Sequence, residues 1–105
     1  MIQVVNKRNY SGPGEYIGRP QSPLGNLWSH KSSKYAILVK SRREAIDKYK
    51  DWIDAEPEDS PAKKELRRLA EIYKKTGELV LICWCSPASC HGHYISELIH
   101  NIAGI

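Results

Sequence analysis

The sequence predicts a small α/β domain with two or three layers, formed by residues 1–105 as a single unit. Residues 2–5 and 79–85 are short apolar runs, which are typical of buried strands. The second run is apolar on both faces, as expected for the centre of a sheet covered by helices. Three further segments carry apolar residues at helical spacing. The resulting order is strand, loop, strand, helix, helix, strand, helix, which favours an α/β fold.

The N-terminal third of the chain is expected to hold little regular structure after its first strand. Residues 9–34 are rich in glycine and proline, which predicts a long ordered loop, with a brief strand at residues 16–17. A loop of this length inside a compact domain is uncommon unless it is functional or disordered, and its aromatic and apolar residues argue against disorder. Residues 35–39 are the next strand candidate.

Helix boundaries are marked by polar and glycine residues. Ser41 and Glu44 have capping-box spacing, which predicts a helix start. Ser60 followed by Pro61 predicts the next start, and Gly77 predicts its end. The last helix is expected to begin near residues 89–91. The expected core residues of the three helices are Ala45, Ile46, Tyr49 and Ile53, then Leu66, Leu69, Ala70 and Tyr73, and finally Tyr94, Ile95, Leu98, Ile99 and Ile102.

Composition narrows the class of protein. Hydrophobic residues make up 41% of the chain, enough for a core that needs no disulfides. The net charge of +4 and the pI of about 9.0 lean towards anionic partners. The longest apolar stretch, residues 79–84, is too short for a membrane span, and residues 1–8 do not look like a signal peptide. We therefore expect a cytoplasmic protein that does not enter membranes.

The three cysteines and a histidine form one compact cluster. Alternation along a strand places Cys83 and Cys85 on one face and turns Trp84 to the other, where it is expected to be core. Cys90 and His91 follow at the expected start of the last helix, where the helix dipole lowers the pKa of a thiol. Cys90 is therefore the candidate reactive thiolate, and His91 is the candidate for acid–base work or orientation.

Two other interpretations of the cluster stay open. Free cysteines are often buried as small hydrophobic residues with no chemical role. Alternatively, Cys83, Cys85, Cys90 and His91 supply four soft ligands for a zinc ion. The spacing departs from the usual pair of separated two-ligand knuckles, and adjacent residues such as Cys90 and His91 rarely converge on one ion.

The loop at residues 18–26 is the second informative stretch. Glycines permit close approach of the backbone, and prolines stiffen it. Arg19 is suited to hold a phosphate or carboxylate, while Ser22 and Asn26 offer hydrogen bonds and the amides offer an anion cradle. The glycine-lysine-serine ending of a nucleotide P-loop is absent. Arg8 is a further candidate for contact with an anion, and an ordinary surface turn is the competing interpretation of the loop.

Taken together, these motifs resemble the prokaryotic and phage family called domain of unknown function 4326. The resemblance rests on Val4-Val5-Asn6-Lys7-Arg8, Tyr16-Ile17-Gly18-Arg19-Pro20, Ser22-Pro23-Leu24-Gly25-Asn26, Cys83-Trp84-Cys85-Ser86-Pro87 and Cys90-His91-Gly92. It implies a small Rossmann-like sheet with flanking helices, whose motifs meet at one sheet edge. The family usually follows Gly-Asn with a proline and an apolar residue, whereas Leu27 and Trp28 stand here. The ligand-binding residues that follow are Asn6, Arg8, Gly18, Arg19, Ser22, Pro23, Leu24, Gly25, Asn26, Cys83 and Cys85.

The leading hypothesis is a domain that binds a nucleotide-like or other phosphorylated small molecule and requires no cofactor. If the protein is an enzyme, the expected chemistry is thiol-assisted transfer or hydrolysis on a nucleotide or nucleobase, with Cys90 as nucleophile or base partner. The first alternative is a zinc-binding structural or regulatory module. The second is an adaptor for nucleic acid or protein that uses the basic residues of the second helix, Lys63, Lys64, Arg67 and Arg68. The oligomeric state is left open.

Overall fold

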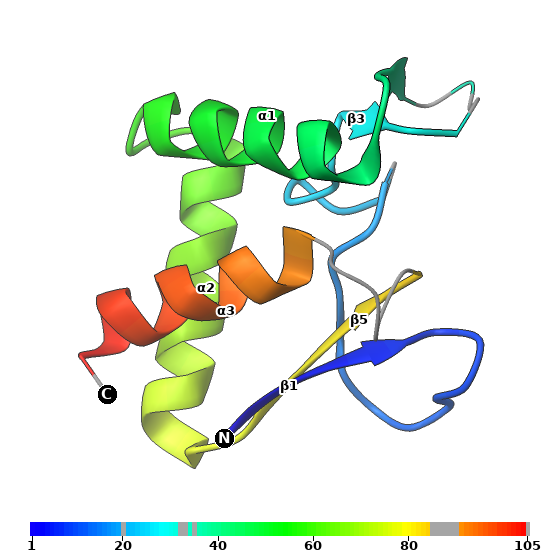
Figure 1. The fold of residues 1–105 in the computed structure, drawn as a ribbon. Coiled ribbons are helices and arrows are strands. Elements are labelled where there is room, and N and C mark those ends of the chain that lie inside the picture. The colour runs from blue at the N-terminus through cyan, green and yellow to red at the C-terminus, as the bar shows by residue number, and fades with distance from the viewer. Residues whose placement is uncertain (20, 32–33, 35, 85–90, 105) are drawn as a thin grey trace.

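The computed structural model describes residues 1–19, 21–31, 34, 36–84 and 91–104. Its main sheet has three parallel strands in the order β1 (Ile2–Asn6), β5 (Leu79–Cys83), β2 (Glu15–Tyr16). In Figure 1 the blue β1 and the yellow β5 run side by side. The apolar run beginning at residue 79 is therefore the central strand, as its two-sided apolar pattern predicts.

A second, smaller sheet lies outside the first. It pairs β3 (Trp28–Ser29) with β4 (Ile37–Leu38) in parallel. The strand expected at residues 35–39 is thus only two residues long, and residue 35 lies outside the described part. The side chains of Ile37 and Leu38 are 59% and 63% exposed, so this strand contributes little to the core.

The three helices begin where the sequence predicts. They are α1 (Arg42–Ala55), α2 (Pro61–Thr76) and α3 (His91–Ala103). Ser41 Oγ accepts a hydrogen bond from the Glu44 amide at 3.1 Å, and Ser60 Oγ accepts one from the Lys63 amide at 3.2 Å. The other half of the first capping box differs, because the Glu44 carboxylate accepts from the amide of Lys40. None of the helices in the described ranges is both long enough and apolar enough to cross a bilayer.

The core lies between the helices and one face of the sheet (Figure 1). Leu79, Leu81 and Cys83 alternate along β5 and turn to that face, where they join the buried side chains of the helices. Most of the expected helix residues are buried there. The departures are Ile46, Tyr94 and Leu98, which are half-buried, and Ile102, which is 47% exposed.

The opposite face of the sheet is covered more thinly. The segment that links β1 to β2 must cross β5, and a Cβ atom at Gly14 would lie 2.9 Å from Ile82 Cδ1. The prediction that Trp84 is core is wrong: its side chain is 53% exposed. Alternation does turn it away from the helices, but this face has only a short segment above it. The prediction of a small α/β domain is confirmed, and the strands of its sheets are parallel.

Candidate functional site

His91 is the first residue of α3 and lies where several parts of the fold meet. Its side chain is only 6% exposed. Ring atom Nε2 is 2.8 Å from the carbonyl oxygen of Ile17, at the head of the 18–26 loop. The ring also packs edge-on against Tyr49 of α1, with centroids 5.0 Å apart. The start of α3 and the glycine–proline loop are therefore in direct contact, as the resemblance implies.

Burial lowers the pKa of His91, and the positive charge of Arg19 and the nearby His93 act in the same direction. The hydrogen bond to the Ile17 carbonyl and the proximity of Cys83 oppose this shift. The imidazole is thus neutral at physiological pH, with the proton on Nε2 donated to Ile17. This tautomer leaves Nδ1 as the acceptor of the ring.

The 18–26 loop is folded by its own hydrogen bonds. Ser22 takes part in three of them: its amide donates to the Gly18 carbonyl, its carbonyl accepts from the Gly25 amide, and its Oγ accepts from the Leu24 amide. Leu24 is fully buried, and its carbonyl accepts a 2.7 Å hydrogen bond from the hydroxyl of Tyr49. The loop therefore packs into the core on one side. Pro23 is exposed.

Arg19 and Asn26 fasten the two ends of this loop. Arg19 Nη1 donates to the carbonyls of Asn26 at 2.5 Å and Trp28 at 3.4 Å. A Cβ atom at Gly25 would lie 2.8 Å from Arg19 Cα, so this close approach requires glycine. Asn26 is buried, accepts from the Trp28 amide at 2.9 Å and donates to the carbonyl of Ala45 in α1. These contacts give both side chains a structural task, and their contact with a ligand stays a prediction.

At the end of β1, Asn6 has a comparable role. Its Nδ2 donates to the carbonyl of Trp84 at 2.9 Å, and its Oδ1 accepts from the amide of Arg8 at 2.8 Å. Asn6 thereby joins the carboxyl ends of β1 and β5. Arg8 is exposed beside this junction.

The structure describes half of the cysteine–histidine cluster. Cys83 is 1% exposed within the core, facing the helices, while Cys85 and Cys90 lie outside the described residues. The described residues contain no group of three or more potential metal ligands, and two of the four proposed zinc ligands are not among them. The zinc site therefore stays a prediction. Because Nε2 of His91 is bonded to Ile17, only Nδ1 is suited to bind a metal there.

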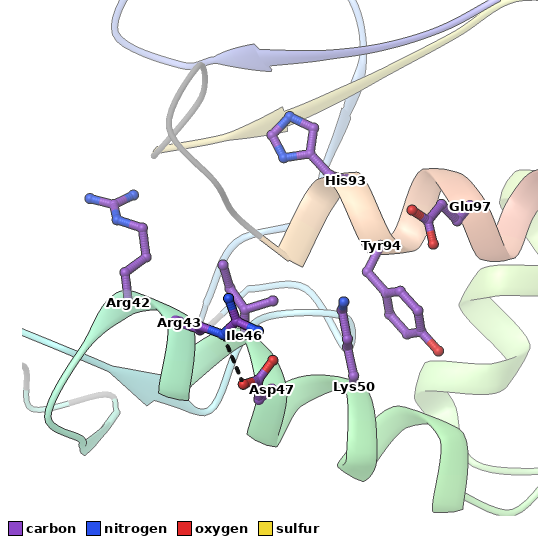
Figure 2. A pocket seen from close by; sticks show the side chains of 8 residues that line it. All are labelled: Arg42, Arg43, Ile46, Asp47, Lys50, His93, Tyr94 and Glu97. Carbon is purple, nitrogen blue, oxygen red and sulfur yellow. Dashed lines mark ion pairs between the residues drawn. The ribbon is translucent and has the colours of Figure 1, made fainter.

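A pocket of about 560 Å³ opens between α1 and α3 (Figure 2). It takes its walls from the first half of α1 and from the first turns of α3, directly after His91. Its lining residues are Arg42, Arg43, Ile46, Asp47, Lys50, His93, Tyr94 and Glu97.

Positive charge predominates in this pocket. Three permanent cations line it, against the carboxylates of Asp47 and Glu97. Asp47 is 3.7 Å from the Nε of Arg43, and Lys50 Nζ is 5.2 Å from the centre of the Tyr94 ring. Burial and the carboxylate of Asp54 raise the pKa of Tyr94 to about 12, so its hydroxyl stays protonated and donates to Asp54. The pocket thus joins cationic side chains to an aromatic wall.

Sequence reasoning missed this pocket. The charges of α1 alternate in sign, which is the usual pattern of a helix face in water. One feature does point to it: Arg42, Ile46 and Lys50 recur every four residues and therefore share one face of α1. That face lies across the pocket from the first turns of α3, from which Tyr94 points towards α1 (Figure 2).

The basic residues of α2 behave differently. Arg67 pairs with Glu58 at 3.0 Å, and Arg68 pairs with Glu65 and with Glu15 of β2. These carboxylates offset the charge that an electrostatic nucleic-acid site would need. The adaptor hypothesis stays a prediction, with part of its basic charge paired within the protein.

The model of the family described as Domain of unknown function (DUF4326) matches residues 2–101. The chain belongs to this family. It matches no curated protein and no solved structure.

The DUF4326 match spans all the motifs that carry the resemblance. Within it, the contact between His91 and Ile17 brings the C-terminal motif onto the loop motif. Ser22, Asn26 and Arg19 then hold the loop, and the loop in turn contacts α1 through Tyr49 and Ala45. The same contacts fix α1 and α3 as the two walls of the pocket.

Proposed function

We propose that this DUF4326 protein binds a nucleotide-like or other phosphorylated small molecule, with its phosphate in the pocket between α1 and α3. The observation that carries the proposal is the pocket itself, which has three cations on its α1 side and opens beside the start of α3. Its volume of about 560 Å³ falls within the range of roughly 300–1,000 Å³ typical of small-molecule sites.

Charge and shape give the pocket residues distinct tasks. Arg42 and Arg43 offer guanidinium groups, each of which can donate two hydrogen bonds to two oxygens of one phosphate. Lys50 offers a point charge held over the Tyr94 ring, and Ile46 provides apolar surface for the rest of the ligand. The proposal therefore moves the anion site from the 18–26 loop to the helices.

The loop and His91 support this site from behind. The loop is bonded to α1 at the Tyr49 hydroxyl and at the Ala45 carbonyl, and His91 contacts both Tyr49 and Ile17. These contacts fix the distance between the pocket walls before a ligand arrives, which lowers the cost of binding. Cys90 directly precedes α3 in the sequence. If the bound ligand is also processed, Cys90 is the candidate nucleophile in the proposal.

Calorimetry tests the proposal with AMP, ATP, ribose 5-phosphate and adenosine as probes. We expect the phosphorylated probes to bind and adenosine to bind more weakly. The double variant Arg42→Ala/Arg43→Ala is expected to lose affinity about tenfold or more, because charge-assisted hydrogen bonds are removed.

The matched control is Lys74→Ala/Lys75→Ala, which removes the same charge from the last turn of α2. It should bind the probes as the parent protein does. Failure of every phosphorylated probe to bind the folded protein would refute the proposal, and so would equal losses in the two double variants.

A further inference from the structure

Trp84 directly follows the central strand and is more than half exposed. It comes after Val80 and Ile82 on the face of the sheet that the helices do not cover. A large apolar ring in this position costs solubility and adds little to the core. This exposure leaves the surface of the ring open to contact from outside the molecule.

The exposed indole is nevertheless held in place. Its Nε1 donates a 2.9 Å hydrogen bond to the hydroxyl of Tyr16, which in turn donates to the carbonyl of Arg19 at 3.5 Å. The backbone of Trp84 is fixed by Asn6, whose Nδ2 is 2.9 Å from the Trp84 carbonyl. Because the indole N–H is satisfied, what the ring offers to a ligand is its aromatic surface. A ring held in this way loses little freedom on binding.

A cation lies over the ring of Tyr16, the hydrogen-bond partner of the indole. Lys7 Nζ is 5.5 Å from the centre of the Tyr16 ring, and Lys7 shares the open face with Val5 and Trp84 by strand alternation. Arg8 follows, exposed, with its amide bonded to Asn6. An aromatic surface beside positive charges suits a flat base that carries a phosphate.

We propose that Trp84, Tyr16 and Lys7 form a stacking platform for a nucleobase. The base stacks on the indole of Trp84, and Lys7 and Arg8 contact the attached phosphate. The base comes either from a free nucleotide or from single-stranded nucleic acid, since both present the same chemistry. This platform is separate from the α1–α3 pocket, which lies on the helix side, so the two proposals can fail independently.

The test measures binding and tryptophan fluorescence with three probes: AMP, an oligothymidylate and ribose 5-phosphate. Stacking on Trp84 should quench fluorescence with the base-bearing probes, and Trp84→Leu should remove that quenching. Trp84→Leu is expected to weaken binding of at least one base-bearing probe about tenfold, since stacking is worth that much per base. Binding of ribose 5-phosphate should not change. Trp84→Phe, which keeps a ring, should retain part of the affinity.

Leu38→Ala is the matched control, because it removes a comparably exposed apolar side chain from the small sheet. If Trp84→Leu weakens the binding of only AMP, the base comes from a free nucleotide. If it weakens the binding of only the oligothymidylate, the base comes from single-stranded nucleic acid. The proposal is overturned if neither base-bearing probe binds, or if Trp84→Leu binds both as the parent does. Arg42→Ala/Arg43→Ala should leave the Trp84 quenching intact, which separates this result from the fate of the pocket.

Discussion

At the scale of single residues, the buried imidazole of His91 joins three segments through one ring. The carbonyl of Ile17 accepts a hydrogen bond from the ring, Tyr49 packs against the ring, and His91 is the first residue of α3. Adjacent Cys and His residues in a sequence are as consistent with a reactive site as with a structural contact. The sequence alone therefore does not assign the structural role to His91. It depends on burial, which only the assembled core creates.

The depressed pKa of His91 makes stability depend on pH. Above about pH 6.5 the ring is neutral in both folded and unfolded chains and adds no pH dependence. Below that value the unfolded chain takes up a proton that the folded protein resists, so stability falls as pH falls. We expect the urea midpoint to drop between about pH 7.5 and about pH 5.5, and His91→Gln to reduce that drop.

His93→Gln is the control, because His93 is exposed on the same helix. It should keep most of the pH dependence of the parent protein, because burial, the largest cause of the shift in the pKa of His91, is unchanged. An unchanged dependence in His91→Gln would contradict the assignment.

Tyrosine hydroxyls donate to backbone carbonyls both in the core and at the surface. Tyr49 bonds the Leu24 carbonyl in a buried site, whereas Tyr10 bonds the Pro13 carbonyl at the surface. Tyr49→Phe leaves a buried carbonyl unsatisfied and should cost about 1–3 kcal/mol of unfolding free energy. Tyr10→Phe should cost clearly less, because water replaces the lost donor. Equal losses in urea unfolding would count against the supporting role of the loop.

At the scale of elements, local chemistry predicts boundaries well and partners poorly. Ser41, Ser60 and Gly77 mark helix ends through contacts within a few residues, and the structure confirms all three. Whether a strand pairs, and with what, depends on distant segments. The expected strand at residues 35–39 therefore shrinks to a two-residue pairing with β3, and Trp84 is exposed because no helix covers its face.

Gly77 ends α2 with a φ of 72°, in the left-handed region that favours glycine. Gly77→Ala should destabilise the protein by about 1–2 kcal/mol, since a side chain at this φ is strained. Gly104 has nearly the same φ, 74°, but it follows α3, where fraying relieves the strain. Gly104→Ala should therefore cost less stability than Gly77→Ala. Thermal unfolding of the two variants compares them. A larger loss at Gly104 would contradict this explanation.

At the scale of the whole molecule, strand order sets where the structure is firmest. β5 is bonded on both sides, β1 and β2 on one side each, and the β3–β4 pair lies apart from them. Hydrogen exchange should therefore be slowest for the amides of residues 79–83 and fast for those of residues 37–38. Equally slow exchange in the small sheet would show that it is part of the main core.

The candidate site is predictable from the sequence only in part. The contact between the loop and the start of α3 is predictable, because segments that follow parallel strands meet at the carboxyl edge of the sheet. The hydrogen bond between His91 and the Ile17 carbonyl is this contact. The α1–α3 pocket does not follow, because its cations lie on α1 and its aromatic wall lies on α3, and no local pattern encodes how these two helices pack.

The position of β5 also has a consequence for synthesis. β1 and β2 pair with β5 and not with each other, yet β5 is made some sixty residues after β2. A nascent chain that ends before residue 79 holds two strands whose sheet partner does not yet exist. The main sheet therefore cannot form until most of the polypeptide has been synthesised. Until then, residues 2–16 have no partner strand within their own chain.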